Sequence, residues 1–186
     1  MKLTLVFLMA AVLYAQPQVT LSTSSPVYPN STIAVAATLS GSAGANLDAI
    51  GLGLPSGSSL PVVGAASTAA GKMLYSNGNT VVLLPPVATP NINTYADGVV
   101  ASFTYTVPAA PPGTVVPLSL TALGVMVGGS PVAIATPTIN LTISVTAGCS
   151  AKIQADIAQY LAAPSVALLG QTVLDMAAAM GGGACN

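Results

Sequence analysis

The sequence predicts a mainly β protein: an antiparallel β-sandwich of eight or nine strands, followed by a small disulfide-closed hairpin of two helices. Short segments alternate apolar and polar residues, with turn residues between them about every 8–12 positions. No helical period appears before Ala147, and two helical stretches then lie between the only cysteines, Cys149 and Cys185. We therefore expect three segments, at residues 1–15, 16–147 and 148–186.

The first segment has the pattern of a secretion signal. Lys2 supplies a positive charge, Leu3–Leu13 is an apolar run too short to span a bilayer, and Ala15 precedes the expected cleavage at Gln16. The alternative is a buried N-terminal helix or strand. With the signal removed, we expect a chain that is secreted or held at the cell surface, without a membrane span.

Three strands are expected in the first part of the sandwich. Their residues are Gln18–Ser24, Thr32–Ser40 and Leu47–Leu54. Each alternates apolar residues with small or polar ones, which is typical of a strand buried on one face. In the third strand Gly51 and Gly53 occupy the face opposite the leucines, so another backbone can come close there or the strand can bulge.

The middle of the sandwich is expected to contain a hairpin. Residues 56–71 are interpreted as a loop of small residues with a short strand at Leu60–Val63. Lys72–Ser76 and Thr80–Leu84 are the two hairpin strands. Asn77-Gly78 between them is the strongest hairpin dipeptide in the chain, because both residues tolerate the left-handed backbone that tight turns require.

The strand at residues 99–107 is expected to organise the core, because it carries both a phenylalanine and a tyrosine in strict alternation. Its inward residues are predicted as Val99, Ala101, Phe103, Tyr105 and Val107, and its outward residues as Val100, Ser102, Thr104 and Thr106. Two further strands are expected at Val115–Leu123 and Val132–Val145, the latter interrupted at Pro137.

The C-terminal segment changes to a helical period. Ile153, Ile157, Tyr160 and Leu161 share one stripe of a first helix that Ser150 caps, and Pro164 ends it. A second helix opens at Pro164 or Ser165 and carries Val166, Leu169, Val173, Met176 or Ala177, and Met180 on one stripe. In an exported protein, Cys149 and Cys185 are expected to form one disulfide that closes this hairpin. Two unpaired thiols are the alternative.

Charge is scarce, and this excludes several function classes. Only 4% of residues are charged, and the chain has no histidine, arginine, glutamate or tryptophan. The chain lacks the basic residues that nucleic-acid binding needs, and it lacks the ligands of a zinc site. No set of catalytic side chains is present either, so we expect no enzyme and no cofactor. Asp48 and Asp97 are candidates for one Ca²⁺ site, or they simply begin a strand and form a turn.

The β region resembles secreted bacterial cohesin-type domains, which are related to carbohydrate-binding sandwiches. The resemblance lies in Val19–Ser24, Asn30–Ser40, Ala65–Leu74 and Asp97–Val107. It implies a non-catalytic domain that binds a dockerin, a calcium-loaded pair of helices, through one sheet face, or that acts as an adhesin. The C-terminal hairpin is similar to a dockerin tail that has lost its calcium loop, since Asp156 is the only carboxylate between residues 150 and 160.

Several binding modes are open at this stage. Tyr28, Tyr75 and Tyr95 fall in or beside loops, where they can stack on a sugar or close the ends of the sandwich. The leading hypothesis is a secreted binding module with a protein or polysaccharide partner. The alternative is a structural subunit of an extracellular fibre or surface layer, because uncharged strands favour self-association. A third hypothesis is that the hairpin covers the partner site on its own sandwich.

Overall fold

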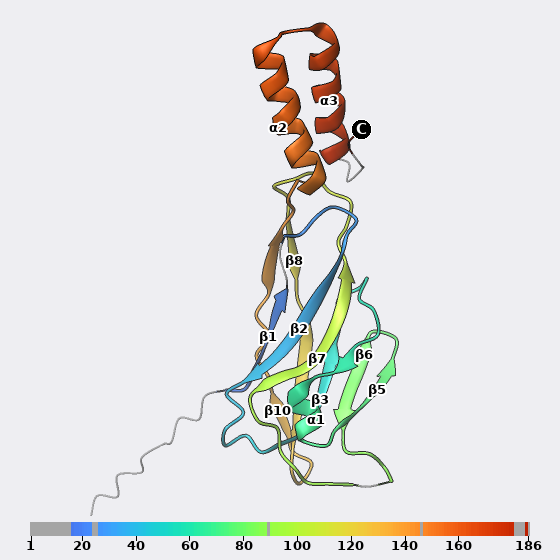
Figure 1. The fold of residues 1–186 in the computed structure, drawn as a ribbon. Helices are drawn as coiled ribbons and strands as arrows, with labels where there is room; N and C mark the ends of the chain where they lie inside the picture. The colour runs from blue at the N-terminus through green and yellow to red at the C-terminus, as the bar shows by residue number, and fades with distance from the viewer. Residues whose placement is uncertain (1–15, 24–25, 89, 146, 181–184, 186) are drawn as a thin grey trace, which may run out of the picture.

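A computed structural model describes residues 16–23, 26–88, 90–145, 147–180 and 185. The predicted signal and Ser24 lie outside these residues. A four-stranded sheet has the order β1-β2-β7-β4, and a five-stranded sheet has the order β10-β9-β3-β6-β5 (Figure 1). The first contains β1 (Gln18–Thr23), β2 (Thr32–Ser40), β7 (Gly98–Thr106) and β4 (Val62–Val63). The second contains β10 (Pro131–Ala133), β9 (Thr121–Met126), β3 (Leu47–Gly53), β6 (Thr80–Leu84) and β5 (Met73–Asn77).

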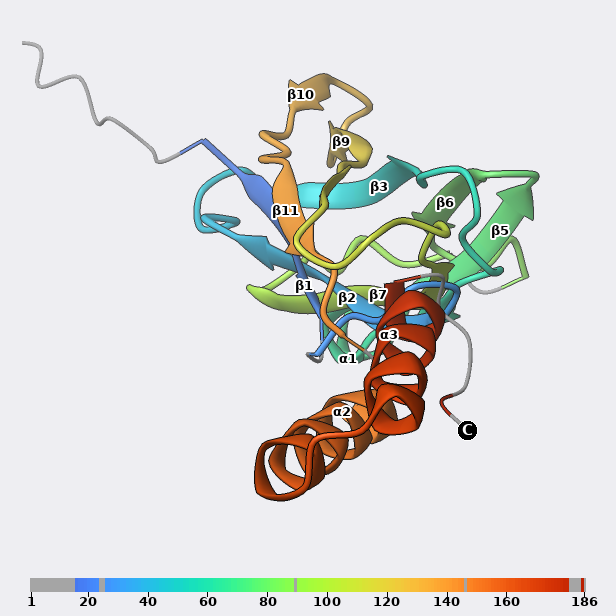
Figure 2. The same ribbon diagram turned by 90° about the horizontal axis from the view of Figure 1, so that it is seen from above.

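The mainly β, antiparallel fold class is confirmed. All strand pairs within the sheets are antiparallel, and the two larger sheets pack face to face around one core (Figure 2). A two-stranded ribbon of β11 (Ile139–Thr142) and β8 (Val115–Leu118) completes the sandwich near the two C-terminal helices. The hairpin at Asn77-Gly78 is also confirmed, with Gly78 at φ +59° in its turn.

The core is aliphatic, as the composition implies. Phe103 and Tyr105 of β7 are buried in it, as predicted from their alternation. The largest fully buried side chains are Leu39, Leu47, Ile50, Leu52, Leu83, Leu118, Ile143, Val19, Val35, Val81, Val100 and Val107. These side chains come mainly from β1, β2, β3, β6, β7 and β8, and stability comes from many small contacts of about 0.8 kcal/mol per buried CH₂.

The predicted facing of Val99 and Val100 is wrong, because β7 contains a β-bulge. Ala37 pairs with Ala101 and Thr38 pairs with Val99, so Val100 is the extra residue on the bulged strand. Val100 is fully buried, whereas Val99 is partly exposed. The Val100 carbonyl leaves the ladder and accepts hydrogen bonds from Gly64 N–H and the Ser67 hydroxyl.

A short helix was not predicted. Helix α1 (Ala65–Ala69) stands where the sequence predicts a loop, and it packs on β7 over the bulge. Its residues are alanine, serine and threonine, so no apolar period marks it. The high helix propensity of alanine is the only local signal.

Two long predicted strands are each divided in the structure. Val115–Leu123 becomes β8 and β9, which belong to different sheets, and Val132–Val145 becomes β10 and β11. Between β8 and β9 the chain passes from one sheet to the other, and Leu118 and Leu120 at this point are both buried. The alternation therefore runs through the crossing without interruption, which is why it predicts one strand.

The predicted pair of C-terminal helices is confirmed. Helix α2 (Ala147–Ala162) begins before Ser150, so the prediction that Ser150 caps it is wrong. Helix α3 (Val166–Met180) begins after Ser165, whose hydroxyl accepts a hydrogen bond from Leu168 N–H. Among the described residues, no helix combines the length and apolarity needed to cross a membrane.

Candidate functional site

The outer face of the five-stranded sheet carries exposed apolar side chains on several neighbouring strands. Ile50, Leu52, Val81 and Leu83 point inward and are fully buried, so their strand neighbours point outward. We call the outward set the apolar face. It consists of Ala49 and Gly51 of β3, Met73 and Tyr75 of β5, Val82 and Leu84 of β6, and Leu123 and Val125 of β9.

One cross-strand row spans this face. Leu123 pairs with Gly51, Gly51 pairs with Val82, and Val82 pairs with Tyr75. Leu123 is 53% exposed and Tyr75 is 39% exposed, so the two ends of the row stand in solvent. Within the row, Leu123 and Val82 flank Gly51, a position that has no side chain.

The missing side chains leave a groove along β3. Gly51 and Gly53 form its floor, and Thr80, Thr121 and Leu123 help to line it, with a volume of about 310 Å³. A Cβ atom added at Gly51 meets only the Leu123 carbonyl oxygen, at 3.8 Å, so the groove is open there. The flanking strands β9 and β6 are two strand spacings apart, about 10 Å.

The opposite sheet has a different outer face. Its exposed or partly exposed positions along β2 and β7 are small and polar, for example Ala34, Thr38, Ser102 and Thr104. Asp48 is the only charged residue in the five strands of the apolar sheet. Val62 of β4, which pairs with Ser102, is 66% exposed on that same outer face. The apolar face is distinguished by its continuous cross-strand row, which makes it the candidate docking surface.

A buried lysine lies at the edge of this sheet. The Lys72 side chain has no exposed surface, and its ammonium contacts Asp48 Oδ1 at 2.7 Å and Asn91 Oδ1 at 3.2 Å. The Tyr95 ring lies under the ammonium, with 5.9 Å between Nζ and the ring centroid. The sequence reasoning missed this group. The one available signal was that Lys72 is the only lysine within the predicted sandwich.

The Asn91 side chain is also held in place. Its Nδ2 donates to the Gly71 carbonyl at 3.0 Å, and its Oδ1 accepts from Asn93 N–H at 3.2 Å as well as from Lys72. Gly71 has φ +66°, and a Cβ there would stand 3.0 Å from Asn91 Nδ2. Glycine at this position therefore permits both the turn and the close approach of Asn91.

The three candidate tyrosines have different environments. Tyr95 is 4% exposed and its hydroxyl donates to the Leu83 carbonyl, so it has no face for a sugar and the stacking interpretation is wrong for it. Burial raises the pKa of the Tyr95 hydroxyl. Tyr28 is half-buried beside Ser31, and only Tyr75 is an exposed ring, at the edge of the apolar face.

The two calcium candidates have separate partners. Asp48 is paired with Lys72, whereas Asp97 accepts hydrogen bonds from Gly41 N–H, Ser42 N–H and the Ser42 hydroxyl at 2.6–3.2 Å. The Ser42 hydroxyl and N–H lower the pKa of Asp97. Within the described ranges no three His, Cys, Asp or Glu side chains converge, and the calcium site stays a prediction.

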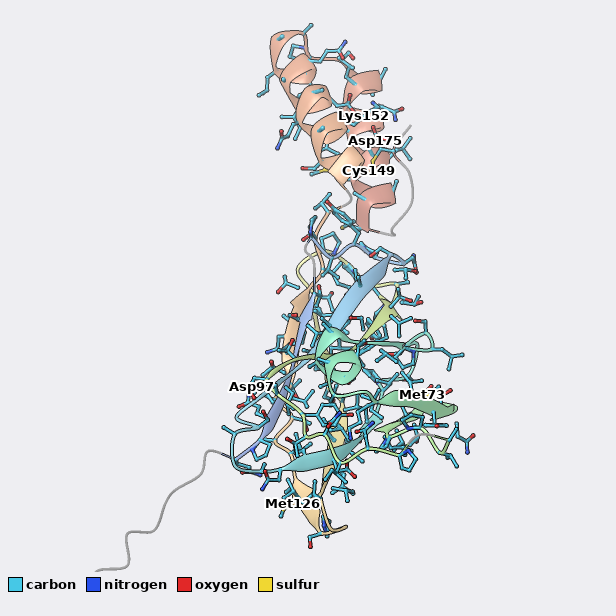
Figure 3. The ribbon with its side chains drawn as sticks, turned by 60° about the horizontal axis from the view of Figure 1, so that its bottom comes forward. Met73, Asp97, Met126, Cys149, Lys152 and Asp175 are labelled. Carbon is cyan, nitrogen blue, oxygen red and sulfur yellow. A yellow bond between two sulfur atoms is a disulfide. The ribbon has the colours of Figure 1, made fainter. Side chains whose placement is uncertain are left out.

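The base of the C-terminal hairpin is joined by a disulfide and an ionic cluster. Cys149 and Cys185 are bonded, as predicted from the sequence. Lys152 of α2 contacts Asp156 at 3.1 Å and Asp175 of α3 at 3.2 Å, and these groups lie near Cys149 (Figure 3). The hydrogen bond to Asp156, followed by that to Asp175, raises the pKa of Lys152.

The hairpin does not cover either sheet. Its helices make their main contacts with each other and project from one end of the sandwich (Figure 1). An apolar hollow of about 350 Å³ lies at the junction, between Pro112 and Val145 of the sandwich and Ile153 and Met180 of the helices. The hypothesis that the hairpin fills the site on its own sandwich is therefore wrong, and the apolar face is open.

Comparison with known proteins finds similar folds only among solved structures. No protein-family model and no curated protein matches the chain. A non-cellulosomal cohesin from the archaeon Archaeoglobus fulgidus is 17% identical, with a TM-score of 0.44, and the match covers 68% of this chain and 91% of that one. A cohesin module from a family 33 glycoside hydrolase of Clostridium perfringens is 14% identical, with a TM-score of 0.48, and the match covers 69% and 97%. Both are cohesin modules, the class named by the sequence resemblance, and the likeness concerns the fold alone.

Proposed function

We propose that this chain is an exported, non-catalytic binding module whose apolar face holds an apolar helix of a partner protein. The observation that carries the proposal is the uncharged row of Leu123, Gly51, Val82 and Tyr75, which is open to solvent. A contiguous exposed apolar surface on a small domain is a common mark of a protein interface. The secretion-signal pattern and the disulfide support export, because disulfides persist in oxidising compartments.

The shape of the groove favours a helix as the occupant. An α-helix with its side chains is about 10–12 Å across, so a helix lying over β3 would reach the side chains of both β9 and β6, whose backbones are about 10 Å apart. The floor is open at Gly51 and can admit a side chain of the helix, whereas the Thr121 side chain occupies the space above Gly53. Leu123 and Val82 would contact the helix from either side of Gly51. Backbone hydrogen bonding is not available to the occupant here, since β3 is paired on both edges.

The test compares two matched lysine substitutions. Leu123→Lys places a charge in the apolar face, and Thr104→Lys places the same charge on the opposite sheet, where Thr104 is exposed. Each immobilised variant and the wild-type protein are incubated with proteins secreted by the source organism. Burial of a leucine contributes about 1.5–3 kcal/mol, so Leu123→Lys is expected to weaken partner binding by at least about tenfold.

The captured protein is then identified and its bound segment is mapped by protection from proteolysis. A partner retained by wild type and Thr104→Lys but lost by Leu123→Lys, through a segment with an apolar helical stripe, supports the proposal. Binding that survives Leu123→Lys, or a partner that is a polysaccharide, overturns it. So does self-association of wild type that Leu123→Lys abolishes, because the occupant is then a second copy.

A further inference from the structure

We propose that Lys72 and Asn91 join in an intramolecular amide bond, with Asp48 carrying the proton between them. The three side chains come from separate parts of the chain: Asp48 from β3, Lys72 from the start of β5 and Asn91 from the loop after β6. They meet around one lysine nitrogen, Nζ of Lys72, at 2.7 Å from Asp48 Oδ1 and 3.2 Å from Asn91 Oδ1.

Lys72 is placed as the nucleophile. Its side chain has no exposed surface, whereas Asp48 keeps 27% of its side-chain surface in solvent. The carboxylate at hydrogen-bond distance provides a base that can take one ammonium proton and leave a free amine.

Asn91 is placed as the electrophile. Its carbonyl oxygen accepts two hydrogen bonds, from Lys72 Nζ and from Asn93 N–H, and both polarise the C=O bond. Because a C=O bond is about 1.2 Å long, the amide carbon lies within about 4.4 Å of Nζ. A movement of about 1 Å brings the two atoms to the distance of about 3–3.5 Å at which such attack begins.

The reaction balances without any further reagent. Asp48 removes a proton from the Lys72 ammonium, and Nζ attacks Cγ of Asn91 to give a tetrahedral centre whose oxygen is stabilised by Asn93 N–H. Protonation of Nδ2 by the Asp48 acid breaks the Cγ–Nδ2 bond. The departing ammonia takes the second proton from Nζ, so the products are a neutral amide between Nζ and Cγ and one ammonium ion, and Asp48 returns to its carboxylate.

The surroundings hold the reacting groups together. Lys72 N–H donates to the Ser67 carbonyl at 2.8 Å, and Asn91 Nδ2 donates to the Gly71 carbonyl at 3.0 Å, next to Lys72. The Tyr95 ring closes one side of the ammonium, and Tyr95 is 4% exposed. The resulting link ties the start of β5 to a loop 19 residues later.

Mass spectrometry of the mature, reduced protein tests the proposal. After digestion with trypsin in urea, a linked Lys72 is acylated and resists cleavage. We expect one uncut peptide that contains both Lys72 and Asn91 and is lighter than its sequence by one ammonia. Peptide mapping is needed because cyclisation of an N-terminal Gln16 also releases ammonia, at a different place in the chain.

Variants assign the roles. Asn91→Ala removes the electrophile and Asp48→Asn removes the base, so both are expected to show cleavage after Lys72 and the full sequence mass. Asn93→Ala is the matched control, because it keeps the backbone N–H and should keep the link. Complete cleavage after Lys72 in the wild-type protein overturns the proposal, whatever the variants do. A peptide lighter by one water, with Lys72 joined to Asp48, overturns it as well, and a link that persists in Asp48→Asn overturns the role of Asp48.

Discussion

Replacing Gly64 by alanine should destabilise the sandwich strongly. Gly64 precedes α1 and its N–H donates to the Val100 carbonyl at the β7 bulge, at 2.9 Å. An added Cβ would stand 2.6 Å from the Val99 carbonyl carbon and 2.7 Å from that of Val100. Carbon atoms in good contact are about 3.5–4.0 Å apart, and the neighbours here are backbone atoms that no rotamer change can move.

The size of the effect follows from two terms. Overpacking typically costs about 1–3 kcal/mol, and loss of the hydrogen bond to Val100 adds about 1 kcal/mol. The free energy of unfolding should therefore fall by about 2–4 kcal/mol, and Tm by roughly 5–15 °C for a domain of this size. Urea unfolding followed by tyrosine fluorescence measures it.

A glycine in the middle of β3 provides the control. Gly51→Ala adds the same methyl group, but its Cβ meets only the Leu123 carbonyl oxygen, at 3.8 Å. It should leave stability unchanged or raise it by up to about 1 kcal/mol, because alanine loses less backbone entropy on folding. If Gly64→Ala unfolds within about 0.5 kcal/mol of wild type, the close approach of α1 to the bulge is not as described and the reasoning fails.

Three further predictions concern individual interactions. Replacing Cys149 and Cys185 together by alanine should lower the stability of the helical hairpin by about 4 kcal/mol, since the disulfide closes a loop of 36 residues. Far-ultraviolet circular dichroism should show the helices melting at a lower temperature while the transition of the sandwich is unchanged. An unaltered melting temperature of the helices would contradict this prediction. The lowered pKa of Asp97 means that its contribution to stability is present above the pKa of an unfolded aspartate and is lost as pH falls through the folded value. Unfolding measured at pH values above and below that range should show that acid lowers the free energy of unfolding more for wild type than for Ser42→Ala. The difference should not exceed about 1 kcal/mol, because Asp97 is exposed. Equal decreases would show that the hydrogen bonds from Ser42 do not lower the pKa of Asp97. Because the pKa of Tyr95 is raised in the folded protein, its contribution to stability is present below the unfolded pKa of about 10 and is lost as pH rises through the folded pKa. Ultraviolet titration should find one fewer phenolate in the folded wild-type protein than in the unfolded protein. Tyr95→Phe should remove this difference.

The strand pattern was predictable because apolar residues alternate in every sheet strand with a buried face. Val19, Val35, Leu52 and Phe103 all fall on the inward side that their strands predict. Val100 did not, because a bulge shifts the alternation by one residue. The Val100 carbonyl there bonds to Gly64 and Ser67, which are distant in the sequence but close in space. Local patterns cannot report a constraint that another segment imposes.

The candidate site was predictable only in part. Gly51 and Gly53 were identified from alternation as a place of close approach, and they form the floor of the groove. The contact of Lys72 with Asp48 and Asn91 was not predicted, because residues separated by 24 and 19 positions meet only through the fold. The buried position of Tyr95 was likewise set by its packing and its bond to Leu83, which no local pattern in its loop encodes.

The direction in which β1 enters the sandwich affects how the molecule bears mechanical load. β1 enters the sandwich from the end away from α2 and α3, and it is paired with β2 along its whole length (Figure 1). Tension applied between the first strand and the helices would pull β1 nearly parallel to its neighbour, so the ladder bonds from Gln18 to Thr23 would share the force in shear rather than open one after another. Val19 N–H and Ala135 N–H, which bond across to Ala135 and Pro17, would resist the same displacement.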